Sequence, residues 1–594
     1  MSTRGSLIQS SVTVPAPSTT RGQCTKLYST PSGSLLAYVR AFGHAHSVNV
    51  VRPVGEYYAA SGDAAGTVKV WDTTGNYSLK LDSKPLSRIN DIACDSESKR
   101  LVVVGEGRAA WGASFSLETG SSIGEISGHS KAVNAVTMRP TRPFKAVTGS
   151  DDFSVCFLNG VPFKYASTSR RHTRFVQSVA YNSSGSLFVS AGSDGQVFLY
   201  DGISAEDRGA LKEGTAAHEK GAFAASWDRE GAKVATSSAD GTCKLWDVES
   251  GKVVQKWVFE GDDDVQSQQV GNTFAAEHLV SLSFSGDLNI LDVRSPVPSR
   301  TLYGHQNPIT ALCVSSPNFD TFISGDSSGR VLATSSVEGE VRPVKGAGHK
   351  GMVVDVVGTR EGRFVSTAYD DTVKELSKDE FGSSSVSTGS QPKALASGAP
   401  ASDSLVLATA SVIEIFTSPG KKVLSTLSLP RESSSATPTC AATSPSLTAV
   451  GTDDSRVHLF STLDGKLVRS IELRANPTAV AFPPEESREK VVAIGLQTGK
   501  VPLYSVETGE IVNARWADIS ARVTSLAFSP SGTHLAASSL DESIRVYSLK
   551  SPSSILSLKN LHKGGASKVC WAGEGKLVSA GADGTIRILE VKLA

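Results

Sequence analysis

One group of residues has the types and spacing for hydrolytic chemistry. His218 is followed by Ser237 or Ser238 and by Asp240, with Trp246 a few residues later. A serine becomes a nucleophile when a histidine and an aspartate are aligned behind it. The same residue types also occur in buried structural networks, so the elements that carry them must decide between the two interpretations.

Other motifs that resemble reactive sites lack the necessary pattern. The segment 495–500 (GLQTGK) has neither the spacing of a phosphate loop nor a Ser or Thr after its lysine, and 105–112 (GEGRAAWG) has the wrong glycine spacing for a dinucleotide site. The acidic turn 260–264 (EGDDD) could bind a hard cation, although such runs are usually only solvated. No histidine or cysteine cluster has metal-ligand spacing. We therefore expect no enzyme, no metal and no cofactor.

A unit of about 43 residues recurs along the whole chain, and it must position all of these side chains. Each copy has an apolar strand, a strand of small residues, a hairpin with Asp or Gly, and a third strand, as in 61–72 (SGDAAGTVKVWD). This period, with four strands per copy and Gly-His and Trp-Asp marks, is typical of a WD-repeat β-propeller. Because one blade cannot bury both of its faces, the blades must stack around an axis.

The repeat favours a structural role for the first group of residues. In WD repeats these positions form a buried hydrogen-bonded network between the start of a blade, its hairpin and its third strand. We therefore predict that His218, Ser238, Asp240 and Trp246 are structural. The same interpretation covers two further pairs, His129 with Asp152 and His172 with Asp194.

Fourteen copies are present. Their first strands are predicted to begin near Thr25, Val48, Ile89, Val133, Phe175, Phe223, Val265, Ile309, Val353, Ala394, Thr437, Thr478, Val523 and Ser567. Because propellers close with about four to eight blades, fourteen copies predict an all-β fold of two tandem seven-bladed WD40 β-propellers. Their predicted ranges are 20–305 and 306–594, with the join near His305.

Two irregularities concern the ends of these rings. The last copy stops after its third strand, while Ser6–Pro15 alternates like a strand, so we expect residues 1–19 to supply a strand that closes the second propeller. A mitochondrial transit peptide is the competing interpretation of this segment. The first copy lacks about 20 residues relative to the period, so either the first blade is a truncated fragment or the sequence is incomplete there.

Composition excludes several classes of partner. The 59 basic and 59 acidic residues are interspersed, whereas electrostatic capture of nucleic acid needs a basic field. No apolar run is long enough for a membrane span, and no signal peptide is visible. The seven cysteines lie far apart, mostly in predicted strands, as expected for core residues of a reducing, cytosolic compartment.

Recognition of a protein partner remains as the expected activity. In the segment 148–176, Phe163, Lys164, Tyr165 and Phe175 lie around a blade boundary. Asp152 occupies the hairpin position that belongs to the buried hydrogen-bonded network of a blade. Its neighbour Asp151 should therefore be free to face outward. Strand alternation could bury some of the aromatic residues, so core and interface both remain open for Tyr165 and Phe175.

Several strings give the sequence a specific resemblance. HAHSV, YYAASGDAAGTVKVWDTTG, ESKRLVVVGEGR, RPFKAVTGSDD, PFKY and HTRFVQSVAYNSSGSLF, together with the fourteen-blade layout, resemble the actin-interacting protein one family. The similarity runs over essentially the whole chain and is strongest between Gly55 and Asp201.

The resemblance implies an actin-binding protein that cooperates with cofilin, or with actin-depolymerising factor, to promote filament severing, capping and disassembly. Its implied partners are filamentous actin and cofilin, and its implied location is the cytoplasm, at cortical structures of the actin cytoskeleton. It further implies a non-enzymatic, monomeric protein in which an N-terminal strand closes the second propeller. A general WD40 scaffold or adaptor subunit is the alternative, and a propeller hydrolase would need convergent acids or metal ligands that are not seen.

The resemblance also implies which residues bind the partner. They are Asp151 of GSDD, the three residues Phe163, Lys164 and Tyr165 of PFKY, and Phe175 after HTR. Ala109 occupies a position that is acidic in the family, which weakens one part of the implied electrostatic contact.

Overall fold

The structure is a computed structural model. It describes residues 28–29, 36–37, 44, 46–74, 78–108, 110–259, 265–275, 278–315, 320–335, 339–359, 363–397, 404–417, 422–484 and 490–592. Within these ranges the secondary structure is β-strand, apart from one 3-10 turn η1 (Arg431–Ser433). None of the described segments is a helix with the length and apolarity needed to cross a bilayer. The chain divides into two compact units, one over Thr20–Leu302 and another that includes Tyr303–Ala594.

The first unit contains six four-stranded antiparallel sheets and one two-stranded sheet. The first strands of the four-stranded sheets are β3 (Val48–Val54), β7 (Arg88–Cys94), β11 (Val133–Met138), β15 (Val176–Tyr181), β19 (Ala222–Trp227) and β23 (Gln269–Ala275). The second strands are β4 (Tyr58–Asp63), β8 (Arg100–Glu106), β12 (Lys145–Ser150), β16 (Leu187–Gly192), β20 (Lys233–Ser238) and β24 (His278–Ser283). The third strands are β5 (Val68–Asp72), β9 (Gly112–Ser116), β13 (Val155–Asn159), β17 (Val197–Asp201), β21 (Thr242–Asp247) and β25 (Leu288–Leu291). The fourth strands are β6 (Leu79–Ser83), β10 (Ser122–Glu125), β14 (Lys164–Ser169), β18 (Asp207–Leu211), β22 (Val253–Val258) and β26 (Arg300–Leu302).

The second unit repeats this plan with six four-stranded sheets and one of three strands. Its first strands are β27 (Ile309–Val314), β31 (Val353–Gly358), β35 (Pro392–Ser397), β39 (Pro438–Thr443), β43 (Pro477–Ala481), β47 (Val523–Phe528) and β51 (Ala566–Trp571). The second strands are β28 (Thr321–Asp326), β32 (Phe364–Ala368), β36 (Ser404–Thr409), β40 (Leu447–Thr452), β44 (Val491–Leu496), β48 (His534–Ser539) and β52 (Lys576–Gly581). The third strands are β29 (Val331–Ser335), β33 (Thr372–Leu376), β37 (Ile413–Thr417), β41 (Arg456–Ser461), β45 (Leu503–Ser505), β49 (Ile544–Ser548) and β53 (Ile586–Glu590). The fourth strands are β30 (Val341–Pro343), β34 (Phe381–Ser387), β38 (Lys422–Leu427), β42 (Leu467–Glu472), β46 (Ile511–Asn513) and β50 (Ile555–Leu558).

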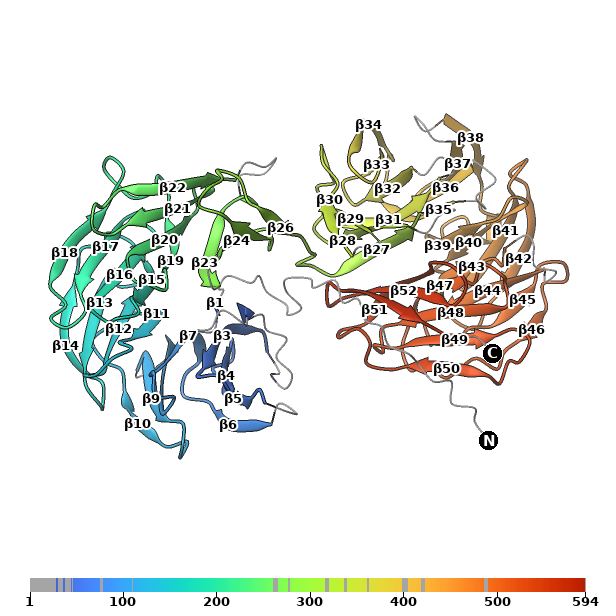
Figure 1. The fold of residues 1–594 in the computed structure, drawn as a ribbon. Helices are drawn as coiled ribbons and strands as arrows, with labels where there is room; N and C mark the ends of the chain where they lie inside the picture. Colours follow the sequence, from blue (N-terminus) through green and yellow to red (C-terminus); the bar gives the residue numbers. More distant parts are fainter. Residues whose placement is uncertain are drawn as a thin grey trace. The chain divides into compact units, whose positions relative to one another are not determined.

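Each unit is a closed ring of sheets. In both units the first strand of a sheet contacts the first strand of the next sheet, so these strands line the centre while the fourth strands lie at the periphery (Figure 1). In the first unit β1 (Tyr28–Ser29) pairs with β2 (Leu36–Ala37), and β1 contacts both β3 and β23, so the short sheet occupies the seventh position. In the second unit β51 contacts β27 and closes the ring. The predicted fold of two tandem seven-bladed β-propellers with a truncated first blade is therefore confirmed.

The hydrophobic core lies between neighbouring blades. One cluster joins Val147 and Phe157 of one blade to Val176, Phe188 and Tyr200 of the next. Both faces of an inner sheet are covered in this way, which is why these strands are nearly continuous apolar runs instead of alternating ones.

Hydrogen bonds between the innermost strands add a second connection between blades. A residue at the second or third position of an inner strand donates a side-chain hydrogen bond to a backbone carbonyl of the next inner strand. Examples are Asn49 to Ile89, Asn90 to Val133, Asn134 to Val176, Thr478 to Val523 and Thr524 to Ala566, with donor–acceptor distances of 2.8, 3.0, 3.2, 2.7 and 2.6 Å.

The predicted strand starts agree with the structure within a few residues, with one clear exception. We predicted that a first strand begins near Val265, whereas β23 begins at Gln269. Val265 itself lies in a turn before β23, so this apolar residue does not belong to the strand. The strand predicted over 6–15 and the acidic turn 260–264 lie outside the described residues, as does Ala109.

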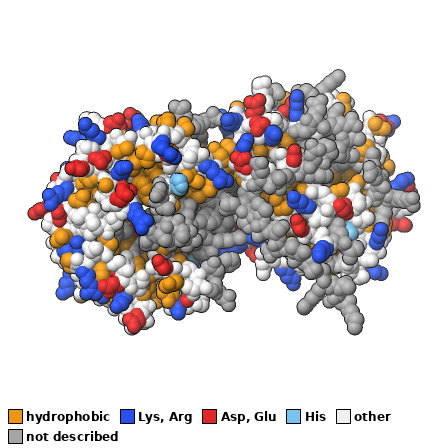
Figure 2. All heavy atoms as spheres, in the orientation of Figure 1, with side chains coloured by type: hydrophobic (Ala, Val, Ile, Leu, Met, Phe, Trp, Pro, Cys, Tyr) orange, Lys and Arg blue, Asp and Glu red, His pale blue; other side chains and the backbone are white. Residues whose placement is uncertain are grey.

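Charged residues are mixed by sign over the surface. On the face drawn in Figure 2, Lys and Arg alternate with Asp and Glu among apolar side chains. This distribution agrees with the balanced composition of 59 basic and 59 acidic residues.

Candidate interaction surface

A His–Asp pair fastens the entry of a blade to its β-hairpin in seven of the blades with described residues. The pairs are His44–Asp63, His129–Asp152, His172–Asp194, His218–Asp240, His305–Asp326, His349–Asp370 and His562–Asp583, with N–O distances of 2.8, 3.1, 3.1, 3.0, 2.9, 3.2 and 2.9 Å. The predicted structural role of His129, His172 and His218 agrees with this repetition.

The network around His218 uses a different hydroxyl from the one predicted. The indole N–H of Trp246 donates to Thr236 Oγ1 at 2.8 Å, and the Thr236 hydroxyl lies 2.8 Å from His218 Nε2. Ser238 instead donates to the carbonyl of Lys220 and accepts from the Asp240 amide. Ser238 is fully buried and connects the start of the blade to its hairpin, as predicted, but the hydroxyl between His218 and Trp246 is that of Thr236. Ser238 ends β20 and faces the loop, whereas Thr236 lies inside the strand, on the face that carries Trp246.

Protonation states follow from burial and hydrogen bonding. Burial lowers the pKa of His218 below its usual 6.5, against the opposing effect of Asp240. Burial also opposes ionisation of Asp240, but the hydrogen bonds from His218 and Thr242 outweigh it and lower the pKa of this carboxyl. A neutral imidazole thus donates from Nδ1 to an ionised carboxylate, and its Nε2 accepts from Thr236. Since every member is buried and hydrogen bonded, the network stabilises the blade.

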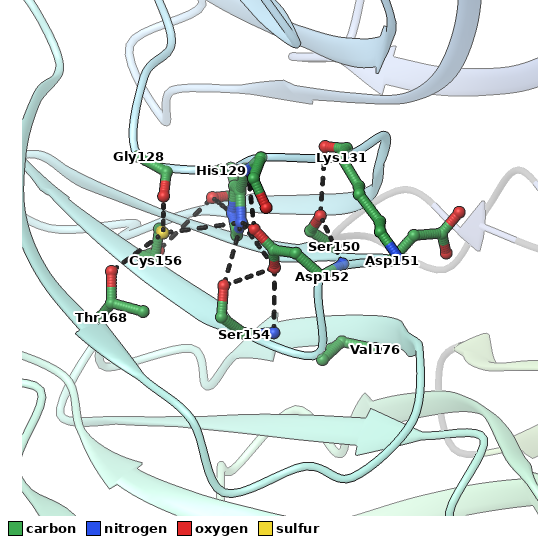
Figure 3. A network of polar contacts seen from close by, with 12 residues as sticks. Gly128, His129, Lys131, Ser150, Asp151, Asp152, Ser154, Cys156, Thr168 and Val176 are labelled. Carbon is green, nitrogen blue, oxygen red and sulfur yellow. Dashed lines mark hydrogen bonds and ion pairs between the residues drawn. The ribbon is translucent and has the colours of Figure 1, made fainter.

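The corresponding network in the β11–β14 blade reaches the outer strand. His129 Nε2 lies 2.8 Å from Thr148 Oγ1, and Ser154 donates to Asp152 at 2.5 Å (Figure 3). The Cys156 thiol lies 3.6 Å from His129 Nδ1 and 3.3 Å from the hydroxyl of Thr168. A continuous polar chain therefore connects the turn after β12 with β14.

Asp151 is turned away from this network, but it is not free. Figure 3 shows its carboxylate pointing away from the group around His129. The side-chain amide of Asn134 donates to the Asp151 carboxylate at 2.7 Å, and the backbone N–H of Asp151 donates to the carbonyl of Ala132. Asp151 therefore faces away from the network, as predicted, and the inner strand supplies a hydrogen-bond donor to it beside the turn.

Phe175 lies next to Asp151, at the entry to the following blade. The Asn134 amide also donates to the carbonyl of Val176, so Asn134 joins Asp151 to the segment that carries Phe175. The Phe175 side chain is 43% exposed, and its ring centroid lies 5.7 Å from that of Phe153. Of the two alternatives for Phe175, the exposed one is observed.

Two residues of this surface were missed from the sequence. Phe153 is 37% exposed, and Lys131 Nζ lies 5.6 Å from the centroid of its ring. The signal was present in the turn sequence, because most other copies have Gly or a small polar residue at the position of Phe153.

Lys164 lies at the opposite edge of the blade from Asp151. It pairs with Asn159, which pairs with Lys145 at the start of β12, whereas Asp151 follows the end of β12. The two ends of a six-residue strand are about 17 Å apart at 3.4 Å per residue. Asp151 and Phe175 are therefore brought together, and Lys164 is not part of their cluster.

Tyr165 is exposed on the outer strand. Its side chain is 49% exposed, and its hydroxyl accepts a hydrogen bond from Thr168 at 3.0 Å. The ring lies against Gly128, where a Cβ would come within 2.6 Å of Tyr165 Cδ2. The exposed alternative therefore holds for Tyr165 as well.

Phe163 cannot belong to a binding surface. It is only 3% exposed and packs in the core with Val136, Phe144 and Leu158. The prediction that Phe163 contacts the partner was wrong, because it is the last residue of the turn between β13 and β14 and points inward, while Lys164 and Tyr165 are exposed.

The described residues offer no other reactive centre. They contain no group of His, Cys, Asp or Glu arranged to hold a metal ion. Their six cysteines are free, and burial raises the pKa of the Cys243 and Cys313 thiols to about 12, which keeps both protonated at neutral pH.

Comparison with known families agrees with the repeat structure. The family model "WD domain, G-beta repeat" matches residues 120–159, 163–201, 212–247, 296–342, 517–548 and 554–589.

Whole-chain comparison finds relatives that are similar along nearly their full length. "Actin-interacting protein 1" of Drosophila melanogaster is 35% identical over 561 residues, which cover 92% of this chain and 90% of the relative. The "66 kDa stress protein" of Physarum polycephalum is 32% identical, with 97% and 98% covered. "WD repeat-containing protein 1" of Gallus gallus is 34% identical, with 92% and 89% covered.

Proposed function

Because this chain belongs to the actin-interacting protein 1 family, we propose that it binds actin filaments and cooperates with cofilin to promote their severing, capping and disassembly. The observation that carries the proposal is the similarity to a relative named "Actin-interacting protein 1" over 92% of this chain and 90% of the relative. The proposed partners are filamentous actin and cofilin or actin-depolymerising factor. The proposed location is the cytoplasm, at cortical actin structures, and the protein acts as a monomer.

The binding surface lies on the first propeller in this proposal. Asp151 and Phe175 lie together at one edge of the β11–β14 blade, and Tyr165 lies on its outer strand. Exposed aromatic side chains on a rigid scaffold supply much of the energy of protein interfaces, while charged groups mainly fix orientation. The neighbouring His129 network supports such rigidity, because it holds the turn that carries Asp151.

The mechanism is a change of equilibrium and breaks no covalent bond in the protein's partners. A protein that binds cofilin-decorated filaments more tightly than bare ones must favour the decorated state by that difference in affinity. If the protein binds the distorted filament most tightly of all, it lowers the free energy needed to break the filament. Aromatic side chains act here as anchors, and Asp151 acts as an orienting group.

Co-sedimentation with actin filaments tests the proposal. The protein should pellet with filaments much more strongly when cofilin is present than when it is absent. Equal and weak sedimentation in both samples would contradict the proposal and favour a general scaffold or adaptor role. Cofilin alone and the protein alone are the necessary controls.

A further inference from the structure

The turn after β12 holds a bulky apolar residue in an unfavourable backbone conformation. Phe153 has φ of 68°, a region that side chains with a Cβ rarely adopt. Its amide donates to the carbonyl of Ser150 at 3.2 Å, the same turn bond that other copies form. Equivalent turn positions are Gly66, Gly195, Gly241, Gly329, Gly499 and Gly584, with φ of 87, 75, 74, 99, 83 and 68°, and three further copies have the polar residues Asp371, Ser455 and Glu542 there, with φ of 55, 63 and 67°. A phenylalanine is therefore retained where the fold itself favours glycine.

The strained residue is also only partly covered. Phe153 contacts the ring of Phe175 from the next blade at 5.7 Å between centroids, and both side chains remain more than a third exposed. Neither local stability nor core packing explains a phenylalanine at this place. Backbone strain combined with an exposed aromatic pair is typical of functional sites.

One basic side chain lies over this aromatic pair, and two more basic residues occur in the connection that precedes Phe175. Lys131 lies over the Phe153 ring, and Arg170 and Arg174 are exposed in the connection that leads to Phe175. Among the described residues, none of these three cations forms an ion pair. We call Lys131, Phe153, Arg170, Arg174 and Phe175 the aromatic–basic patch.

The backbone around the patch is fixed before any partner binds. The carbonyl of Phe175 accepts a hydrogen bond from the Ser193 amide at 2.8 Å, and the Thr173 amide donates to Asp194 at 2.8 Å. Because both aromatic residues are held on hydrogen-bonded turns, binding would require little ordering of the main chain.

We infer that the aromatic–basic patch binds an acidic polypeptide segment that places an apolar side chain against Phe153 and Phe175. The inference rests on the proposed function, since that segment would belong to the cofilin-decorated filament. Charge complementarity supports an acidic partner, as the three cations lack acidic partners of their own. A single-stranded nucleic acid is less suited, because the patch is small, Asp151 lies beside it and the protein has no net positive charge.

Replacing Phe153 separates binding from folding. Phe153→Gly and Phe153→Asn place residues that tolerate positive φ in the turn, so the thermal unfolding temperature should not fall. Binding to cofilin-decorated filaments should weaken at least about tenfold, as expected for the loss of an interface anchor. Ile203→Ala, which removes an exposed apolar side chain from a turn at the opposite edge of the next blade, should leave binding unchanged.

The outcomes distinguish the two proposals. If the wild-type protein binds decorated filaments and both Phe153 variants bind equally well, the inference is wrong while the proposed function stands. If the wild-type protein does not bind at all, the proposed function fails and the inference fails with it.

The charge of the partner is tested by salt dependence. A Lys131→Gln, Arg170→Gln, Arg174→Gln triple variant should bind decorated filaments more weakly at low salt and show a flatter dependence on ionic strength than the wild type. An unchanged salt dependence would overturn the acidic partner. Patch-dependent binding of a fluorescent single-stranded RNA would also overturn it, in favour of nucleic acid.

Discussion

The side-chain amide of Asn134 donates to the Asp151 carboxylate at 2.7 Å and to the carbonyl oxygen of Val176 at 3.2 Å. One inner-strand residue thus fixes the turn after β12 relative to the start of the next blade. Asp151 and Phe175 are 24 positions apart in the sequence, and this contact ties their two segments together.

Removing this link should affect stability and binding together. Asn134→Ala should lower the free energy of unfolding by about 1–2 kcal/mol, because the buried carbonyl of Val176 loses a donor. It should also weaken binding to decorated filaments, since Asp151 is no longer held beside Phe175. Denaturant unfolding and co-sedimentation measure the two effects. Asn90→Ala, which removes the equivalent inter-blade bond one blade earlier, should cost similar stability without the loss of binding, and an equal loss of binding would contradict this role of Asn134.

Phe163 and Tyr165 should respond oppositely to truncation. Phe163→Ala should destabilise the first propeller by about 3–5 kcal/mol, because it leaves a cavity in the core. Tyr165→Ala should cost about 1 kcal/mol or less, since the side chain is half exposed, but it should reduce filament binding, most clearly when combined with Phe175→Ala. A folded Tyr165→Ala, Phe175→Ala double variant that still disassembles cofilin-coated filaments at the full rate would show that these residues are not the site.

The hydroxyl inside the His218 network can be identified by two matched substitutions. Thr236→Val should lower the free energy of unfolding by about 2–3 kcal/mol, because Trp246 Nε1 and His218 Nε2 both lose their partner in a buried place. Ser238→Ala should cost only about 1 kcal/mol, since it removes one hydrogen bond at the strand end. Chemical denaturation of both variants distinguishes the two roles, and the reverse order of effects would contradict the central position of Thr236 between His218 and Trp246.

Acid should destabilise both propellers in two stages. The pKa values of His129, His218 and His349 are lowered by burial from 6.5, so the unfolded chain binds more protons and stability declines as the pH falls below about 6.5. The pKa values of Asp152, Asp240 and Asp370 are also lowered from 3.8, because hydrogen bonds outweigh burial, and their contribution is lost as the pH falls below about 4. Melting temperatures between pH 8 and pH 3 test this order. Constant stability from pH 7 to pH 5 would contradict it, and His278→Gln, at an exposed position, is the control.

The N-terminal segment should stabilise the second propeller. Among the described residues β53 is the outermost strand of a three-stranded sheet, whereas the other six sheets of that unit have four strands. We propose that residues 1–19 supply the missing strand, so their deletion should increase hydrogen exchange in β53 and lower the melting temperature of this unit. Deletion of residues 1–5 alone, which spares the predicted strand, should have little effect. Unchanged exchange in β53 after the longer deletion would count against strand pairing and leave the transit-peptide interpretation.

Most of the fold could be predicted from the sequence period, because each blade is a similar sheet that must bury both of its faces against neighbouring blades. The start of β23 was misplaced by four residues, since an apolar Val265 in a turn resembles a strand residue. Side-chain direction at single positions was harder to predict. Phe163 and Tyr165 are two residues apart, yet one is buried and the other exposed, because Phe163 lies in the turn before β14 and Tyr165 lies in the strand itself.

The candidate site depended on contacts between repeats, which no single repeat reveals. The pairing of Phe153 with Phe175 joins two blades, and the hydrogen bond from Asn134 to Asp151 joins two strands of one blade. The position of Lys164 at the far edge likewise follows from strand register. Only the unusual Phe153 in a turn that favours glycine could have been noticed in advance.

Imaging of single actin filaments tests the central claim most directly. Fluorescent filaments partly decorated with cofilin should shorten and break faster when this protein is added, and bare filaments should not. The same protein with Phe153→Gly should fold normally and accelerate breakage much less. If the wild-type protein leaves the breakage rate of cofilin-decorated filaments unchanged, the proposed role in filament disassembly is contradicted.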